Sequence, residues 1–245
     1  MSVEKVTVTA KRKSSGWGGQ LMQLAGIVAA VFIAKGALAE PFYVPSGSME
    51  PTLLIGDALL ASKFPYGYGT SSLPIQINLP ESGRVFAETP KQGDVVVFRW
   101  PGDRSQAWVK RVVGLPGDRI QMRQGQLFLN EKPVTRVALK ETDGEAACGT
   151  DDAKVRNWRE TLPNGASYIT YDCVDSGYYD NTDVYTVPPG HFFVLGDNRD
   201  NSTDSRVMST MGFVPMDNLV GRVTRIIWSL DDDGEPRFER MGKVR

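Results

Sequence analysis

The sequence predicts a mostly β protein that is preceded by one long apolar helix. Short apolar runs recur along the chain, and 25 glycines and 15 prolines are spread among the 245 residues. Glycine and proline distributed in this way favour short strands joined by tight turns. The one long apolar stretch lies near the N-terminus, at residues 16–38. A chain of this length can bury a sizeable core in one large domain or two small ones.

The charges of the chain nearly balance, with a net charge of -1. No part of the sequence carries the strong basic surplus that is typical of nucleic-acid-binding domains. Nucleic acid is therefore excluded as the main partner.

The N-terminal apolar stretch predicts a membrane anchor. The basic residues 11–13 precede a segment of apolar and small residues that only Gln20 and Gln23 interrupt before Lys35. A helix that continues to Leu38 is roughly 33 Å long, which is enough to cross a bilayer. Because basic residues stay on the cytoplasmic side, we expect residues 1–15 to be a cytoplasmic tail, residues 16–38 the anchor, and the remainder to lie outside.

A cleaved signal peptide is the alternative interpretation of the same segment. The tripeptide at residues 37–39 is Ala-Leu-Ala, the small-residue pattern of a cleavage site ahead of Glu40. Lys35 lies close to the supposed cut and the apolar stretch is long, so we expect residues 1–39 to stay attached. Both alternatives export the main body.

The chain has two cysteines, Cys148 and Cys173. In an oxidising compartment they can form a disulfide, and the alternative is two unpaired thiols. With one histidine, His191, and two distant cysteines, no zinc-ligand spacing is present, so we expect no metal and no cofactor.

A candidate nucleophile lies in the segment VPSGSMEPTLLIGD, residues 44–57. Ser46 and Ser48 flank one glycine, with Pro45 before them and Pro51 after, which predicts a rigid turn that presents a hydroxyl. A serine hydroxyl becomes a nucleophile only when a neighbouring group takes its proton.

A candidate base lies in a predicted strand at residues 107–114, which follows a short buried strand at residues 95–99. Alternation places Trp108, Lys110 and Val112 on one face of the later strand. A lysine held among apolar groups loses hydration and its pKa falls, so that it can act as a general base. The alternative is an edge-strand lysine whose amine extends to water.

A polar segment, GDNRDNSTDSR at residues 196–206, follows the apolar run at residues 192–195. A calcium loop fails because Arg199 stands at a ligand position, Ser202 replaces the required glycine and Met208 replaces the closing glutamate. A solvated polar turn and a hydrogen-bonded loop both remain open from the segment alone.

Taken in order, PSGSMEPTL, VKRVVGLPGD and GDNRDNSTDSR, with GFVP at residues 212–215, resemble the type I signal peptidases. These are membrane-bound serine proteases that remove signal peptides from exported proteins. The resemblance runs from Glu40 to about Val223. It implies preprotein signal peptides, membrane lipid and the nearby export machinery as partners. It also implies a bacterial inner membrane, which the long polar insertion favours over the related mitochondrial setting.

The resemblance implies a Ser-Lys dyad, with Ser48 as nucleophile and Lys110 as general base. The hydroxyl of Ser46 and the backbone N–H of Ser48 would form the oxyanion hole. His191 matches no catalytic position of the family and is expected to be structural.

Three further residues of the polar segment have implied supporting roles. Ser202 would orient the lysine amine by a hydrogen bond. Asp204 and Arg206 would form an ion pair beneath the site.

The implied fold is a signal-peptidase and repressor-protease-like core of coiled antiparallel sheets, built from residues 40–118 and 188–245. A non-catalytic β insertion would occupy residues 119–187, where RIQMRQGQLFLNEKPV predicts a hairpin. The substrate cleft would accept small side chains at the residue before the cut and two residues further back. The residues implied to line it are Val44, Pro45, Met49, Leu53 and Val109.

Two other classes of protein compete with this interpretation. An autoproteolytic regulator of the repressor type shares the Ser-Lys chemistry but needs a DNA-binding domain where this chain has the apolar stretch. A membrane-tethered β module without enzymatic activity would not need Ser48 and Lys110 together. Other serine hydrolase signatures are missing, since there is no G-x-S-x-G and the only S-x-x-K begins at Ser2.

Overall fold

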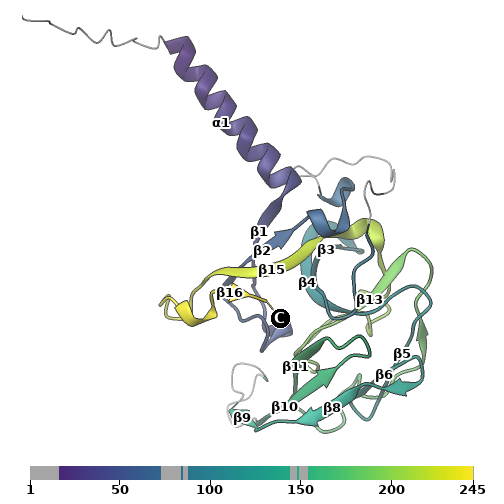
Figure 1. Ribbon diagram of the computed structural model, residues 1–245. Coiled ribbons are helices and arrows are strands. Elements are labelled where there is room, and N and C mark those ends of the chain that lie inside the picture. The colour runs from purple at the N-terminus through teal and green to yellow at the C-terminus, as the bar shows by residue number, and fades with distance from the viewer. Residues whose placement is uncertain (1–16, 73–83, 85–87, 144–147, 149–153, 245) are drawn as a thin grey trace, which may run out of the picture.

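The computed structural model describes residues 17–72, 84, 88–143, 148 and 154–244 (Figure 1). Its N-terminal helix, α1 (Trp17–Ala37), projects away from a body made of β-sheets. The predicted tail at residues 1–15 lies outside the described residues. Strand β1 (Ala39–Tyr43) begins two residues after α1 ends, so the helix leads directly into the first sheet.

Helix α1 forms within the segment that the sequence predicts to be helical. Among the described residues, no helix is both long and apolar enough to cross a membrane.

Eight strands in the described part of the chain form one antiparallel sheet, in the order β1-β2-β15-β3-β4-β13-β14 with β16 paired to β15. The predicted strands at residues 95–99 and 107–114 correspond to β3 and β4, and β4 begins four residues earlier than predicted. The bounds beyond β1 are β2 (Asp57–Ser62), β3 (Val95–Trp100), β4 (Asp103–Gly114), β13 (His191–Leu195), β14 (Val214–Pro215), β15 (Leu219–Ser229) and β16 (Gly242–Lys243).

Strand β3 is buried on both faces. Val95 and Val97 belong to one apolar cluster, whereas Val96 and Phe98 belong to another on the opposite face. A strand covered on both sides needs an uninterrupted apolar run rather than an alternating one, which explains the sequence of β3.

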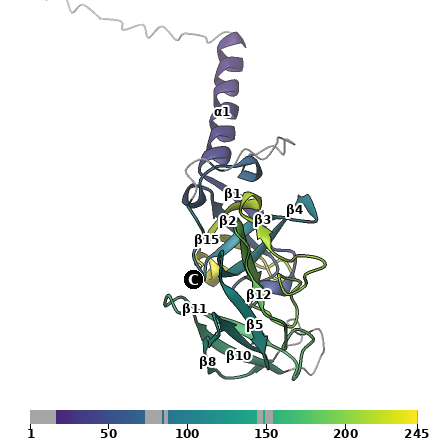
Figure 2. The ribbon, with the colours of Figure 1, turned by 90° about the vertical axis from the view of Figure 1, so that its right-hand side faces the viewer.

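The strands between residues 119 and 186 form two smaller sheets among the described residues. Both lie at the end of the body opposite α1, as the two views show (Figures 1 and 2). One sheet has the order β12-β5-β6-β7, and the other the order β11-β10-β8 with β9 paired to β10. Their bounds are β5 (Arg119–Arg123), β6 (Gln126–Leu129), β7 (Lys132–Pro133), β8 (Thr135–Ala138), β9 (Thr142–Asp143), β10 (Lys154–Thr161), β11 (Ser167–Asp172) and β12 (Tyr185–Thr186).

The predicted hairpin is confirmed, because β5 and β6 pair antiparallel from Ile120↔Leu129 to Arg123↔Gln126. Buried side chains join these strands to the main sheet: Ile120 shares an apolar cluster with Val113 of β4 and Phe193 of β13. The smaller sheets therefore pack against the strands that carry the polar segment and Lys110.

Cys148 and Cys173 form a disulfide in the structure. Cys173 directly follows β11, so the bond attaches the segment at residue 148 to the end of that strand.

Candidate active site

Ser48 lies in a short 3-10 helix, Gly47–Met49, between β1 and β2. The two ends of this connection are joined by backbone hydrogen bonds, from Val44 N to Asp57 O at 2.9 Å and from Gly56 N to Val44 O at 3.1 Å. The segment is therefore a folded loop that fixes the direction of Ser48. Ser48 is buried to 8% exposure, whereas Ser46 is exposed and its Oγ lies 3.4 Å from the Ser48 Oγ.

Lys110 reaches Ser48 from the middle of the main sheet. Strand β4 is an inner strand of the sheet. It pairs with β3 at Lys110, and its pairing with β13 begins at the next residue, Arg111. Its side chain is 3% exposed, and its Nζ is hydrogen bonded to Ser48 Oγ at 2.5 Å. The amine also lies 5.7 Å from the centre of the Trp108 ring. The structure thus brings together the two residues that the sequence predicts as nucleophile and base.

The surroundings lower the pKa of the Lys110 amine to about 8. Burial is the main cause, because removing an ammonium from water disfavours its charged form. The carboxylates of Asp204 and Asp197 act in the opposite direction, and the guanidinium of Arg206 lowers the pKa further. A substantial fraction of the amine is therefore neutral near pH 8, and a neutral amine can accept a proton.

The polar loop, residues 196–206, follows β13 and passes directly against Ser48. The backbone N–H of Asn198 donates to Ser48 O at 3.2 Å. A Cβ placed on Gly196 would lie 2.5 Å from Ser48 O and 2.1 Å from Ser202 Oγ, so only glycine fits there. The loop and the nucleophile are packed backbone against backbone.

Asp204 and Arg206 form an ion pair inside the polar loop, with Arg206 Nε donating to Asp204 Oδ1 at 2.8 Å. Asp204 Oδ2 also accepts from the N–H of Gly196 at 3.0 Å. Burial alone would raise the pKa of Asp204, but the charge and hydrogen bonds of Arg206 hold it below its ordinary value. Asp204 is therefore a permanent anion near Lys110.

Ser202 is buried, and its Oγ has no hydrogen-bond partner in the structure. The hydrogen bond to Lys110 that the resemblance implies is thus not formed here. The Ser202 side chain instead lies against Gly196, next to Ser48.

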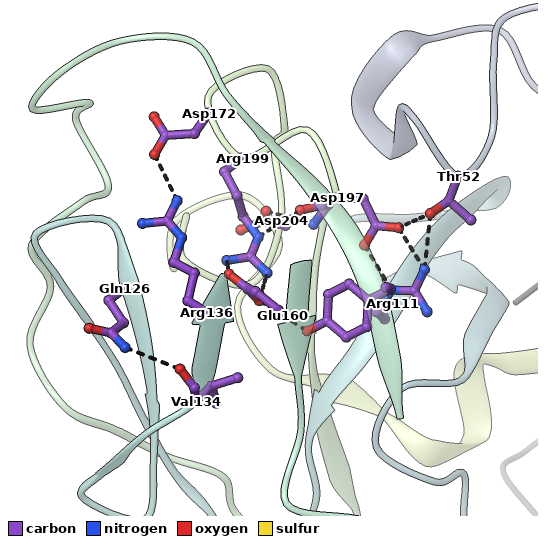
Figure 3. Close-up of polar contacts among 12 residues, drawn as sticks. Thr52, Arg111, Gln126, Val134, Arg136, Glu160, Asp172, Asp197, Arg199 and Asp204 are labelled. Atoms are coloured by element: carbon purple, nitrogen blue, oxygen red, sulfur yellow. Dashed lines mark hydrogen bonds and ion pairs between the residues drawn. The ribbon is translucent and has the colours of Figure 1, made fainter. Parts of the chain in front are cut away.

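A buried pair that sequence reasoning missed lies beside the candidate dyad. Arg111 donates to both carboxylate oxygens of Asp197, at 2.8 and 2.7 Å, and Thr52 Oγ1 donates to the same carboxylate at 2.5 Å (Figure 3). Three segments meet there: β4, the polar loop and the loop that carries Ser48. The available signal was the placement of Arg111 and Asp197 next to apolar strand residues, where an unpaired charge is costly.

A groove of about 660 Å³ runs past Ser48 and Lys110. Pro45 and Val109 line it, as the resemblance implies. The other three residues expected on its surface, Val44, Met49 and Leu53, belong instead to the buried core beneath it. Sequence reasoning missed several lining residues, which are Phe42, Tyr43, Leu59, Val97, Gln106, Ala107, Trp108, Asn201 and Thr203.

His191 lies at the start of β13, where its Nδ1 is 2.9 Å from Pro189 O, and it is not part of the groove lining. Within the described ranges, no cluster of three or more His, Cys, Asp or Glu side chains could hold a metal ion.

Known proteins resemble this chain over most of its length. The family model described as signal peptidase, peptidase S26, matches residues 17–228. A signal peptidase I from Rickettsia typhi is 39% identical over 221 residues, which cover 85% of this chain and 81% of that protein. A signal peptidase I from Rickettsia canadensis is 37% identical over 247 residues, covering 96% and 89% respectively.

A solved structure, a signal peptidase I from Enterococcus faecalis V583, is 28% identical and covers 56% of this chain and 98% of that one. Its TM-score is 0.33, too low to support any statement about the fold. The match of the family model and the identity to the Rickettsia proteins are sufficient without it: the chain belongs to the signal peptidase family, peptidase S26.

Proposed function

We propose that this chain is a membrane-bound serine endopeptidase that removes N-terminal signal peptides from exported preproteins. Cleavage follows small residues at A-x-A sites, with Ser48 as nucleophile and Lys110 as general base. The observation that carries the proposal is the hydrogen bond between Lys110 Nζ and Ser48 Oγ, made by an amine that is 3% exposed.

The first half of the proposed reaction acylates the enzyme. The neutral amine of Lys110 takes the proton of Ser48 as its Oγ attacks the scissile carbonyl. The negative charge that develops on the carbonyl oxygen is stabilised by the backbone N–H of Ser48 and the hydroxyl of Ser46. Lys110 then gives the proton to the leaving amine, and the mature protein departs while the signal peptide stays esterified to Ser48.

The second half regenerates the enzyme. A water molecule loses its proton to Lys110 and attacks the ester carbonyl, and the bond to Ser48 Oγ breaks. Proton return from Lys110 restores the serine hydroxyl and releases the signal peptide with a new carboxyl group. Burial of the amine supports both steps, because it keeps the pKa of Lys110 close to the working pH.

The groove supports an extended, apolar substrate. Its wall includes Val97 and Val109 together with Tyr43, next to the serine hydroxyl. An extended peptide can add to a strand edge by main-chain hydrogen bonds while its side chains enter shallow apolar pockets.

We assign residues 40–118 and 188–245 to the catalytic core and residues 119–187 to a non-catalytic insertion. The main sheet and the two smaller sheets support this division, since no sheet of the described residues mixes strands from both parts. In this proposal the preprotein, lipid and the nearby export machinery are the partners, and nucleic acid is not.

Replacement of the two dyad residues tests the mechanism. Ser48→Ala and Lys110→Ala should each abolish cleavage of a preprotein in detergent. Lys110→Arg should be equally inactive, because a guanidinium stays protonated at any working pH. Substantial cleavage by folded Lys110→Arg protein would show that only positive charge is needed and would defeat the mechanism.

The pH dependence of kcat/KM, which reports the pKa values of the free enzyme, provides a separate test. Raising the pH through the pKa of Lys110 converts the ammonium to the amine that accepts a proton, so kcat/KM should increase with pH. The midpoint should lie near 8, below the roughly 10.4 of a free lysine. Circular dichroism over the same range checks that the fold is constant, and a rate that falls as pH rises would contradict the assignment.

Ser202→Ala separates a role in chemistry from a role in folding. Its Oγ is buried without a partner, so removing it should leave the thermal midpoint unchanged or higher. If Ser202 orients the Lys110 amine during the reaction, kcat should still fall about ten- to a hundredfold, which corresponds to about 1–3 kcal/mol. Unchanged turnover in the folded variant would remove Ser202 from the site.

We further propose that residues 16–38 anchor the protein in a bacterial inner membrane, with residues 1–15 in the cytoplasm and the catalytic core outside. Large apolar side chains of α1 are exposed and support this, among them Trp17 at 82%, Met22 at 77% and Ile27 at 62%. The intact mass of protein isolated from membranes should include residues 1–39. A mature chain that starts at Glu40 would overturn the retained anchor.

A further inference from the structure

We propose that Glu160, on strand β10, is a positioning residue for Ser48 and that it acts through Arg199 of the polar loop. The inference rests on the proposed function. It makes the section between residues 119 and 187 a working part of the active site, although none of its residues lines the groove.

Glu160 and Arg199 form a two-pronged ion pair in the interior. Arg199 Nη1 donates to Glu160 Oε1 at 3.0 Å, and Nη2 donates to Oε2 at 2.6 Å (Figure 3). The side chain of Arg199 is 4% exposed and that of Glu160 is 1% exposed, and the hydroxyl of Tyr168 donates to the Glu160 carboxylate at 3.2 Å. A pair held by two parallel hydrogen bonds fixes the orientation of the guanidinium as well as its distance.

Arg199 in turn holds the two ends of the polar loop. Its Nε donates to Gly196 O at 3.1 Å, and its own carbonyl oxygen accepts from Arg206 Nη2 at 2.6 Å. The first contact fixes the start of the loop and the second its end. Both depend on where the Arg199 side chain and backbone lie.

The polar loop transmits this position to the nucleophile. Gly196 packs so closely on Ser48 O that no Cβ fits between them, and Asn198 N–H donates to the same carbonyl oxygen. A displacement of Gly196 therefore displaces the peptide of Ser48. Dyad chemistry depends on atoms held within a fraction of an ångström, so a small displacement reduces the rate of the chemical step.

The charge of Glu160 has a second role in the proposal, because Glu160 and Asp197 both attract the guanidinium of Arg199. Burial disfavours the charged form of Arg199, and the carboxylate of Glu160 is the strongest influence that raises its pKa again, with Asp197 contributing less. Without Glu160, the guanidinium would be drawn toward Asp197. That carboxylate already binds Arg111, the strand neighbour of Lys110.

Backbone contacts show that β11 (Ser167–Asp172), the partner strand of β10, lies against the same loop. Tyr171 N donates to Asp197 O at 2.8 Å, and Arg199 N donates to Tyr171 O at 2.9 Å. Neither of these bonds involves the side chain of Glu160. The side-chain pair then decides how the loop is oriented.

A set of four variants of the full chain tests the inference. Glu160→Gln removes the charge, Arg199→Gln removes the guanidinium, and the double variant removes both. Asp172→Asn is the matched control, because Asp172 is equally part of the insertion, is buried, and pairs with Arg136 and Arg156 rather than with the polar loop. Cleavage of a preprotein in detergent gives kcat and KM, and thermal unfolding gives the stability of each variant.

We expect Glu160→Gln to lower kcat at least tenfold with KM within about twofold, and Asp172→Asn to change kcat less than about twofold. The double variant is decisive. It leaves no unpaired buried charge, so its thermal midpoint should recover relative to Glu160→Gln. Its kcat should stay low, because the contact with Gly196 is still missing. If Glu160→Gln does not fold, Arg199→Gln and the double variant should both show the low kcat.

Recovery of kcat together with stability in the double variant would overturn the inference, as would an equal loss of kcat in Asp172→Asn. Hydrogen exchange of residues 196–206 gives a measure that does not require cleavage, and it should be faster in Glu160→Gln than in Asp172→Asn. Equal exchange in these two variants would overturn the inference. A wild-type protein without peptidase activity would overturn the proposed function instead.

Discussion

The burial of one amine, that of Lys110, is the constraint on which the rest of the site depends. Water would hold this group as an ammonium, and strand β4 removes it from water in the centre of the main sheet. The carboxylates nearest to it could restore its charge, but Asp204 and Asp197 are each engaged by an arginine. The balance leaves the pKa of the amine at about 8, well below that of a lysine in water, while keeping the amine hydrogen bonded to Ser48.

Buried arginine–carboxylate pairs join the segments that meet at the candidate dyad. Such pairs contribute little net stability, because the cost of removing two charges from water offsets their attraction. Their value here is geometric, since a planar guanidinium fixes a carboxylate in two directions. Two of them connect the polar loop to β4 and to β10, and the third lies within the loop. The pairs are Arg111–Asp197, Arg199–Glu160 and Arg206–Asp204.

Local patterns predicted much of the fold and marked Lys110 and the two serines as candidates, whereas the choice of Ser48 with Lys110 came from the family resemblance. Apolar runs located β3 and β13, turn residues located the β5–β6 hairpin, and alternation placed Lys110 beside Trp108. The resemblance implied the short-range pair of Asp204 and Arg206. The other two pairs were beyond reach because their members are far apart in sequence, by 86 residues for Arg111 and Asp197 and by 39 for Glu160 and Arg199. No local sequence pattern identifies which of the many charged residues will form an ion pair.

The groove lining was predicted less well than the dyad. Val44, Met49 and Leu53 are close to Ser48 in sequence, but the loop folds on itself and turns their side chains into the core. Strand β4 also begins earlier than its apolar residues do, because pairing of Trp100 with Asp103 continues the ladder regardless of polarity. Backbone hydrogen bonding determines both the fold of this loop and the start of β4. The pattern of apolar and polar side chains does not predict such backbone bonds.

The short connection between α1 and β1 affects how far Ser48 lies from a lipid surface. Only Leu38 separates the helix from a strand of five residues, which is about 17 Å long, and Ser48 lies five residues beyond its end. With α1 in the bilayer, as proposed, the length of this strand would fix the distance between the lipid surface and Ser48. A scissile bond much closer to the lipid, or much farther from it, would not meet the serine. The distance of the cleavage site from the membrane would therefore select substrates, in addition to the sequence of that site.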